Sequence, residues 1–296
     1  MSAPAAPELA RRIGRWALTG LVINGIIGSA IFGLPATVSQ RLGRSAPWAW
    51  ALAAILIGVV VACFAEVASR FRDAGGPYLY ARATFGRFAG LQTGWMAYLT
   101  RLTASAAVVN LFVSYLGVFL PGATSGSGRL LVVTFLLAGL AAINYRGVGP
   151  GAGVSSAFAV LKLAGLTLFV AAGLAWLGGG HQPVSAPPPP PGLDPWLGTM
   201  LVLVFAYGGF EAALMPLAEA REPERDAPVA LFVALGAASV VYMLVQAVVT
   251  LTLSDPGATA TPLADAARGF MGDSGAALIA ATALLSTTGY LAGAMV

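Results

Sequence analysis

Residues 24–35 read NGIIGSAIFGLP, and they interrupt an apolar stretch that is long enough to cross a membrane. Glycine and proline are unfavourable in the interior of a helix. Lipid cannot satisfy free backbone N–H and C=O groups, so irregular backbone at membrane depth is tolerated only where it is buried in protein or lines a polar cavity. The segment therefore predicts a broken transmembrane helix with a binding site at the break.

The composition identifies an integral membrane protein. Hydrophobic residues make up 58% of the 296 residues and charged residues only 9%, whereas roughly 25% of a soluble domain is charged. The net charge of +4 does not indicate a nucleic-acid partner, because the arginines are scattered between apolar stretches and form no basic stripe. Cys63 is the only cysteine of the sequence and His181 is its only histidine, so no disulfide, metal site or cofactor is expected.

Eight apolar stretches come close to the 20 residues that a membrane-spanning helix needs. The third is longer than a bilayer requires and the fourth is short. Placing the N-terminal tail, residues 1–15, in the cytoplasm puts ten arginines inside and four outside, as the positive-inside rule favours. The predicted spans are residues 16–38, 48–69, 88–120, 130–144, 154–177, 195–217, 229–253 and 276–296.

A second weak point lies in the sixth span, at residues 205–211, which read FAYGGFE. The first and sixth spans are five helices apart, as corresponding positions of two five-helix inverted repeats would be, and paired broken helices form the substrate site in such repeats. The predicted organisation is a first repeat at 16–178, an external proline-rich loop at 179–194 and a partial second repeat at 195–296. The alternative is that these glycines only let helices pack closely. No motif of a soluble enzyme is present.

Several motifs, in order, resemble those of the amino acid–polyamine–organocation (APC) superfamily of transporters. The resemblance extends over nearly the whole chain. It implies an all-α polytopic membrane protein with the five-plus-five inverted-repeat (LeuT-type) fold, the second repeat being incomplete after an eighth helix. The motifs are residues 25–32, Glu66, residues 75–80, residues 94–95, residues 205–211 and residues 219–228.

The resemblance implies an α-amino-acid site between the two broken helices. By likeness to the family, backbone N–H groups of Gly28, Ser29 and Ala30 would hold the substrate carboxylate, and a helix N-terminus suits an anion. Carbonyl groups of Ile26, Phe205 and Gly208 would hold the ammonium group, and Phe205 would also gate the site. Relatives often have glycine where this chain has Ala30, so the approach to the carboxylate is expected to be narrower here.

Lys162 lies in the middle of the fifth span, where an ionisable side chain is costly and marks a pathway or a pair. The alternative is that it extends to the interface. The resemblance implies that its ammonium replaces a sodium ion and faces Ser286 and Thr287 on the eighth span. Glu211 follows the second weak point and either carries protons or holds the sixth helix by hydrogen bonds. Arg101, also within a span, is expected to form a structural ion pair.

The expected function is secondary active transport of amino acids or related amines, by proton-coupled symport or by exchange (antiport). The expected partners are a small-molecule substrate, protons and membrane lipid, without nucleic acid, and no enzymatic activity is predicted. The expected location is the cell membrane, with several spans and a cytoplasmic N-terminus. Because the sequence stops at Val296 inside an apolar stretch, truncation is expected, and a non-transporting fragment or membrane interaction protein is the alternative.

Overall fold

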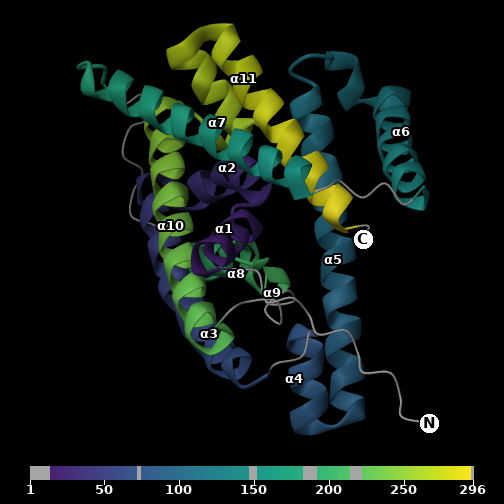
Figure 1. Cartoon of the computed structure of the whole chain (residues 1–296). Helices are drawn as coiled ribbons and strands as arrows, with labels where there is room; N and C mark the ends of the chain where they lie inside the picture. Colours follow the sequence, from purple (N-terminus) through teal and green to yellow (C-terminus); the bar gives the residue numbers. More distant parts are fainter. Residues whose placement is uncertain (1–13, 72–74, 147–151, 183–191, 214–221, 295–296) are drawn as a thin grey trace, which may run out of the picture. The chain divides into compact units, whose positions relative to one another are not determined.

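The computed structural model describes residues 14–71, 75–146, 152–182, 192–213 and 222–294, and these residues form helices and connecting turns without any strand (Figure 1). The first predicted span is broken, as expected. Helix α1 (Arg15–Ile26) ends before the glycine-serine segment, and α2 (Ala30–Leu42) begins after it. The sixth span is broken in the same way, into α8 (Leu193–Ala206) and the short α9 (Phe210–Ala213).

The remaining spans are also helical. Six helical stretches within the described ranges are long and apolar enough to cross a membrane. Helix α5 has 30 residues, which is about 45 Å at 1.5 Å per residue and exceeds the hydrocarbon thickness, as its sequence predicted. Besides α1, α2, α8 and α9, the described helices and short 3-10 helices (η) are η1 (Gly43–Ser45), α3 (Ala46–Arg70), α4 (Gly76–Phe85), α5 (Arg87–Leu116), η2 (Pro121–Thr124), α6 (Gly126–Tyr145), α7 (Ala152–Gly178), α10 (Pro223–Thr252), η4 (Pro256–Ala258) and α11 (Pro262–Ala294).

The chain forms two compact units that alternate along the sequence. The first comprises Met1–Ile26, Ala54–Ala97 and Tyr207–Ala238, and the second comprises Ile27–Ala53, Tyr98–Ala206 and Ser239–Val296. The predicted division into two repeats therefore remains a sequence-based expectation. Most of the predicted external proline-rich loop lies outside the described residues.

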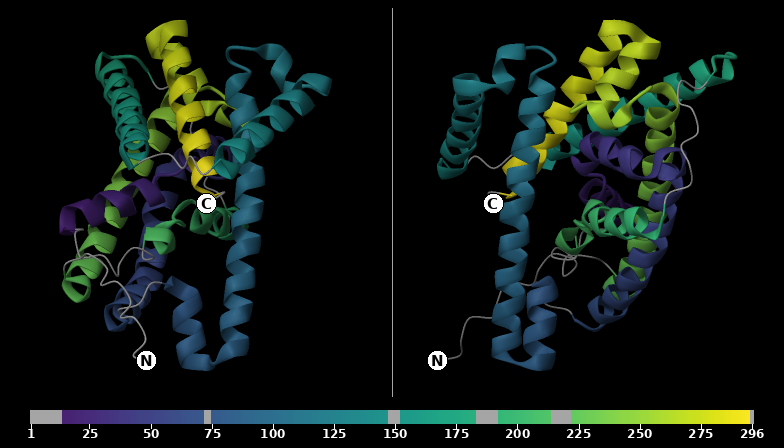
Figure 2. Two further views of the ribbon diagram at one scale, coloured as in Figure 1. Left: turned by 45° about the vertical axis from the view of Figure 1, so that its right-hand side comes forward. Right: turned by 180° about the vertical axis from the view of Figure 1, so that it is seen from behind.

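In the first unit, α1 packs against α9, and Phe64 of α3 contacts Phe210 edge to face, with ring centroids 5.4 Å apart. Helix α4 turns back on the beginning of α5 as an antiparallel pair (Figure 2). The charged sequence around Asp226 is typical of a solvated loop, but Asp226 is buried in the first turn of α10. There it accepts a hydrogen bond from Arg15 at 2.8 Å, which offsets the cost of burying the carboxylate.

In the second unit, α7 and α11 pack closely against each other as antiparallel helices (Figure 1). A Cβ atom added to Gly165 would lie 2.5 Å from Thr282 Oγ1, and one added to Gly289 would lie 3.3 Å from the ring of Phe158. Small residues thus allow the two backbones to approach, as in other membrane helix pairs. The same two contacts place Lys162, three residues before Gly165, level with residues 285–286 of α11.

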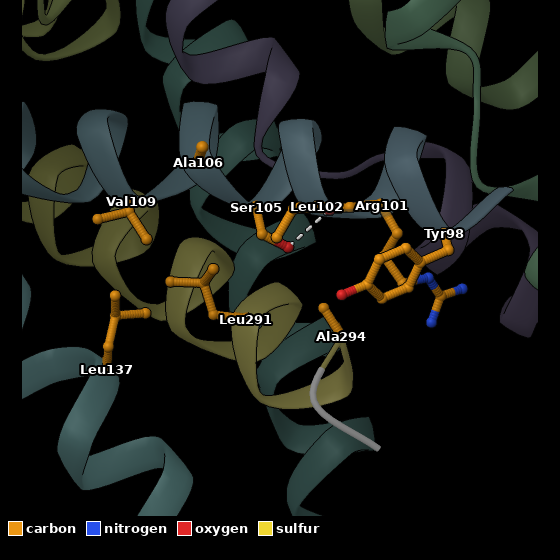
Figure 3. Close-up of a pocket in the computed structure, with 9 residues that line it drawn as sticks. All are labelled: Tyr98, Arg101, Leu102, Ser105, Ala106, Val109, Leu137, Leu291 and Ala294. Atoms are coloured by element: carbon orange, nitrogen blue, oxygen red, sulfur yellow. Dashed lines mark hydrogen bonds between the residues drawn. The ribbon is translucent and has the colours of Figure 1, made fainter. Parts of the chain in front are cut away.

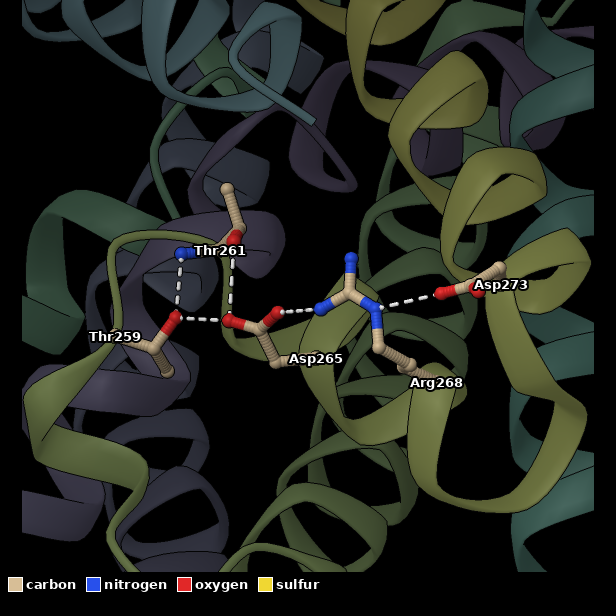
Figure 4. A network of polar contacts seen from close by, with 5 residues as sticks. All are labelled: Thr259, Thr261, Asp265, Arg268 and Asp273. Atoms are coloured by element: carbon tan, nitrogen blue, oxygen red, sulfur yellow. Dashed lines mark hydrogen bonds and ion pairs between the residues drawn. The ribbon is translucent and has the colours of Figure 1, made fainter. Parts of the chain in front are cut away.

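Helix α11 begins 14 residues earlier than the predicted span and contains a kink at Gly272, where φ is +69°. A network of polar contacts crosses the kink (Figure 4). Arg268 donates to Asp265 at 2.6 Å on one side of Gly272 and to Asp273 at 3.1 Å on the other. Thr259 and Thr261 donate to the second oxygen of Asp265. The network therefore fixes the helical turn that precedes the kink.

Candidate substrate and coupling site

The first break consists of residues 27–29, and Ser29 occupies the N-cap position of α2. Its side chain is 4% exposed and makes no capping hydrogen bond. The first N–H groups of a helix have no partner within the helix. The first turn of α2 contains no acidic residue that would take them up. The start of α2 therefore offers the backbone donors and positive dipole end that suit an anionic group.

The second break consists of residues 207–209, which form a turn between α8 and α9. Gly209 has φ +101°, and its N–H donates to Glu211 Oε2 at 2.8 Å. Glu211 therefore stabilises the break itself, which supports the hydrogen-bonding role among the two that its sequence position left open. Phe205 at the end of α8 is 46% exposed, whereas Ile26 at the end of α1 is 1% exposed.

The end of α1 meets the second break at a pair of glycines. A Cβ atom added to Gly25 would lie 2.9 Å from the carbonyl oxygen of Gly209, and one added to Gly209 would lie 2.5 Å from the carbonyl oxygen of Gly25. Neither position has room for a side chain, because the obstructing atoms belong to backbone. Both predicted breaks are present, as the shorter non-helical segments 27–29 and 207–209, and the end of α1 contacts the second of them at this pair.

Lys162 is the only lysine in the sequence and is 6% exposed on α7. Its Nζ donates to the carbonyl oxygen of Ile27, inside the first break. The alternative that this side chain extends to the membrane interface is wrong, because the ammonium group is buried against the broken helix. The carbonyl of Ile27 lies outside regular helix. Lipid cannot donate a hydrogen bond to it, and Lys162 does so instead.

The two hydroxyl groups expected near Lys162 differ in their contacts. Ser286 is 7% exposed, and its Oγ has no hydrogen-bond partner among the described residues. Thr287 instead donates to the carbonyl oxygens of Ala283 and Leu284 in its own helix, at 2.8 and 3.0 Å. The register of α7 and α11 puts Ser286 at the level of Lys162. Of the two hydroxyl groups, that of Ser286 is therefore better placed to face the lysine.

Arg101 lies on a groove of about 350 Å³ between α5, α6 and α11 (Figure 3). Its side chain lies beside Tyr98, while Val109 and Leu137 line the opposite end of the groove. No carboxylate lines this groove, and Arg101 forms no ion pair with any residue in the described part of the chain. The expected structural ion pair is therefore not found there.

Sequence reasoning missed Tyr242 on α10. This side chain is fully buried, and its hydroxyl donates to the carbonyl oxygen of Ala206, the last residue of α8, at 3.1 Å. The available signal was a polar residue every fourth position in an apolar helix, at Tyr242, Gln246 and Thr250. That spacing places all three on one face.

The helices, their two glycine-rich breaks and the buried lysine define a polytopic membrane protein with irregular backbone at helix interiors. A model of the amino acid permease family matches residues 13–296, and the chain belongs to this family.

Three relatives illustrate the range of the family. The chain is 26% identical over 258 residues to a methylthioribose transporter of Bacillus subtilis (strain 168), and 27% identical over 260 residues to a branched-chain amino acid permease of the same organism. Both alignments cover 82% of this chain and 55% of the relative. An L-methionine/branched-chain amino acid exporter of Escherichia coli (strain K12) is 28% identical over 236 residues, covering 75% of this chain and 52% of the exporter. The chain spans about half the length of these relatives.

Proposed function

We propose that this protein carries out secondary active transport of amino acids or related amines across the cell membrane, with its N-terminus in the cytoplasm. The observation that carries the proposal is the meeting of two broken helices at Gly25 and Gly209, with the buried Lys162 bonded to the first break. Broken helices of this kind form ion and substrate sites in transporters. Membership of the amino acid permease family supports the same conclusion.

In the proposed site, the backbone N–H groups of Gly28, Ser29 and Ala30 bind the substrate carboxylate. The support is the N-terminus of α2, which has neither a side-chain cap from Ser29 nor an acidic residue in its first turn. Carbonyl groups of Ile26, Phe205 and Gly208 bind the ammonium group, because backbone freed at the end of a helix leaves acceptors without intrahelical partners. The substrate class follows from this pairing of donors and acceptors.

The proposed coupling ion is a proton carried by Lys162. When charged, this side chain donates to Ile27 in the first break. The hydroxyl of Ser286, which has no partner in the described part of the chain, lies at its level on α11. Thr287 is a less direct contributor, since its hydroxyl is bonded within α11. Loss of the proton removes the charge that strengthens the contact with Ile27. Protonation of Lys162 would thereby favour one arrangement of the first break. If Lys162 is not the proton carrier, Glu211 is the next candidate.

A substrate panel in proteoliposomes tests this proposal against its alternative, a non-transporting fragment or membrane interaction protein. The panel contains labelled L-leucine, L-valine, L-methionine and 5-methylthioribose, each measured with and without an inward proton gradient. We expect uptake of at least one amino acid, increased by the gradient and unaffected by added sodium. Exchange of preloaded substrate without a gradient would indicate antiport. Absence of both uptake and exchange for every compound, with folded protein in the vesicles, would favour the alternative.

A further inference from the structure

Helix α10 carries a buried polar stripe formed by Tyr242, Gln246 and Thr250. Their exposed fractions are 0%, 0% and 3%. Burial of a polar side chain costs free energy unless the group is hydrogen-bonded, so such groups in a protein interior have partners. The partners of this stripe lie on α2, α3 and α8, all within the second unit.

Gln246 connects α10 to two other helices through opposite ends of its amide. Its Oε1 accepts from Trp50 Nε1 of α3 at 2.9 Å. Its Nε2 donates to Ser39 Oγ at 2.8 Å and to the carbonyl oxygen of Pro35 at 3.2 Å, both on α2. An indole N–H only donates and a carbonyl only accepts, so these partners allow one orientation of the amide. Gln246 therefore fixes α2 and α3 against α10.

Tyr242 lies one turn before Gln246 and connects α10 to α8. Its hydroxyl donates to Ala206 at 3.1 Å, and its ring packs on Trp50 with centroids 4.6 Å apart. The last four carbonyls of a helix lack intrahelical partners, and Ala206 ends α8. Tyr242 thus satisfies one of these carbonyls directly beside the second break.

The stripe therefore holds the helix that begins after the first break and the helix that ends at the second. We propose that Tyr242 and Gln246 are positioning residues of the substrate site, because their hydrogen bonds attach α2 and α8 to the same face of α10. Neither residue contacts the substrate. They act by keeping α2 and α8 at a fixed spacing. The predicted effect on substrate affinity holds only if the protein is the transporter proposed above. The claim that Tyr242 and Gln246 attach α2 and α8 to α10 does not depend on that function.

The joining is tested by distance measurements between spin labels in the membrane-reconstituted protein. Labels at Gln40→Cys on α2 and Leu197→Cys on α8, both of which replace exposed side chains, are introduced together with Cys63→Ser. We expect a single narrow distance distribution in the parent protein and a broadened one with Tyr242→Phe, which removes only the hydroxyl. Gln246→Met is expected to broaden it too. Thr252→Val is the matched control, since this hydroxyl donates to Val248 of its own helix.

Transport kinetics provide the second measurement, with L-leucine as the probe. Tyr242→Phe is expected to raise KM about three- to tenfold with kcat changed less than twofold, since one hydrogen bond contributes about 0.5–1.5 kcal/mol. A purely structural defect would instead lower the amount of active protein and leave KM unchanged. Distance distributions of both variants that superimpose on that of the parent would overturn the proposal. Lack of leucine transport in the parent would count against the proposed function alone, and the label distances would still decide the joining of the helices.

Discussion

Replacement of Lys162 by alanine is expected to abolish substrate accumulation driven by a proton gradient while leaving folded protein in the membrane. The buried ammonium group donates to Ile27 in the first break, and no other lysine exists to replace it. In the proposed mechanism, acid outside protonates Lys162 and favours the substrate-binding arrangement, so accumulation by the parent protein rises as the outside is acidified. Without the side chain, that dependence is lost. The measurement is uptake in proteoliposomes at several imposed pH gradients.

The variant Lys162→Arg distinguishes the role of the positive charge from the role of proton release. Arginine keeps a positive charge and is not deprotonated in proteins. We therefore expect this variant to lose the response to the gradient as well, even where it retains binding. Accumulation that still follows the imposed gradient in Lys162→Ala would exclude this lysine as the coupling group. The same experiment on Glu211→Gln would then be the informative one.

The second large effect is expected for Gly209→Ala. The backbone of Gly209 has φ +101°, a conformation that costs an L-residue about 1–2 kcal/mol. The added Cβ would lie 2.5 Å from the carbonyl oxygen of Gly25, a backbone atom that cannot move aside without shifting α1. We expect a Tm several degrees lower than that of the parent and loss of substrate binding. Thermal unfolding in detergent and a binding assay measure the two effects.

Gly236→Ala on α10 is the matched control. No atom lies within 4 Å of a Cβ added there, and the residue is helical. Alanine is favoured over glycine in a helix by roughly 0.5–1 kcal/mol. This control is expected to be as stable as the parent or slightly more so. A Tm for Gly209→Ala equal to that of Gly236→Ala would contradict the close contact between the end of α1 and the second break.

The breaks could be predicted from the sequence because their cause is local. Glycine and proline destabilise a helix whatever the helix packs against. The two interruptions could therefore be located directly from residues 24–35 and 205–211. The burial of Lys162 was predictable for a similar reason, since its distance from either end of the span depends only on residue count. In each case the physical constraint acts within one segment.

The contacts between helices could not be predicted in the same way. Hydropathy does not distinguish a helix face that contacts lipid from one that contacts protein, so the direction of Tyr242 and Gln246 became clear only with α2 and α8 in place. Thr287 shows a related limit. A threonine hydroxyl within a helix often bonds a carbonyl of the preceding turn, and this local partner replaces the expected contact across to α7. The hydrogen bonds of Arg268 on both sides of the kink at Gly272 likewise could not be read from hydropathy.

The most direct test of the central claim is ligand binding to the parent protein and to Ser29→Leu, with Ser29→Ala as the control. The ligands are L-leucine, L-leucinamide, which lacks the carboxylate, and 3-methylbutylamine, which has only the amine. We expect the parent to bind leucine and to bind both analogues about 10- to 100-fold more weakly, because hydrogen bonds to a charged group contribute about 1.5–3 kcal/mol.

Ser29→Ala keeps the backbone donors at the start of α2 and is expected to retain leucine binding within a few fold. Ser29→Leu places a bulky side chain at a position that is 4% exposed, and it should lose leucine binding while remaining folded. Scintillation proximity binding of labelled leucine, alongside thermal unfolding of the same samples, gives both quantities. Unchanged leucine affinity in folded Ser29→Leu would contradict a carboxylate site at the first break.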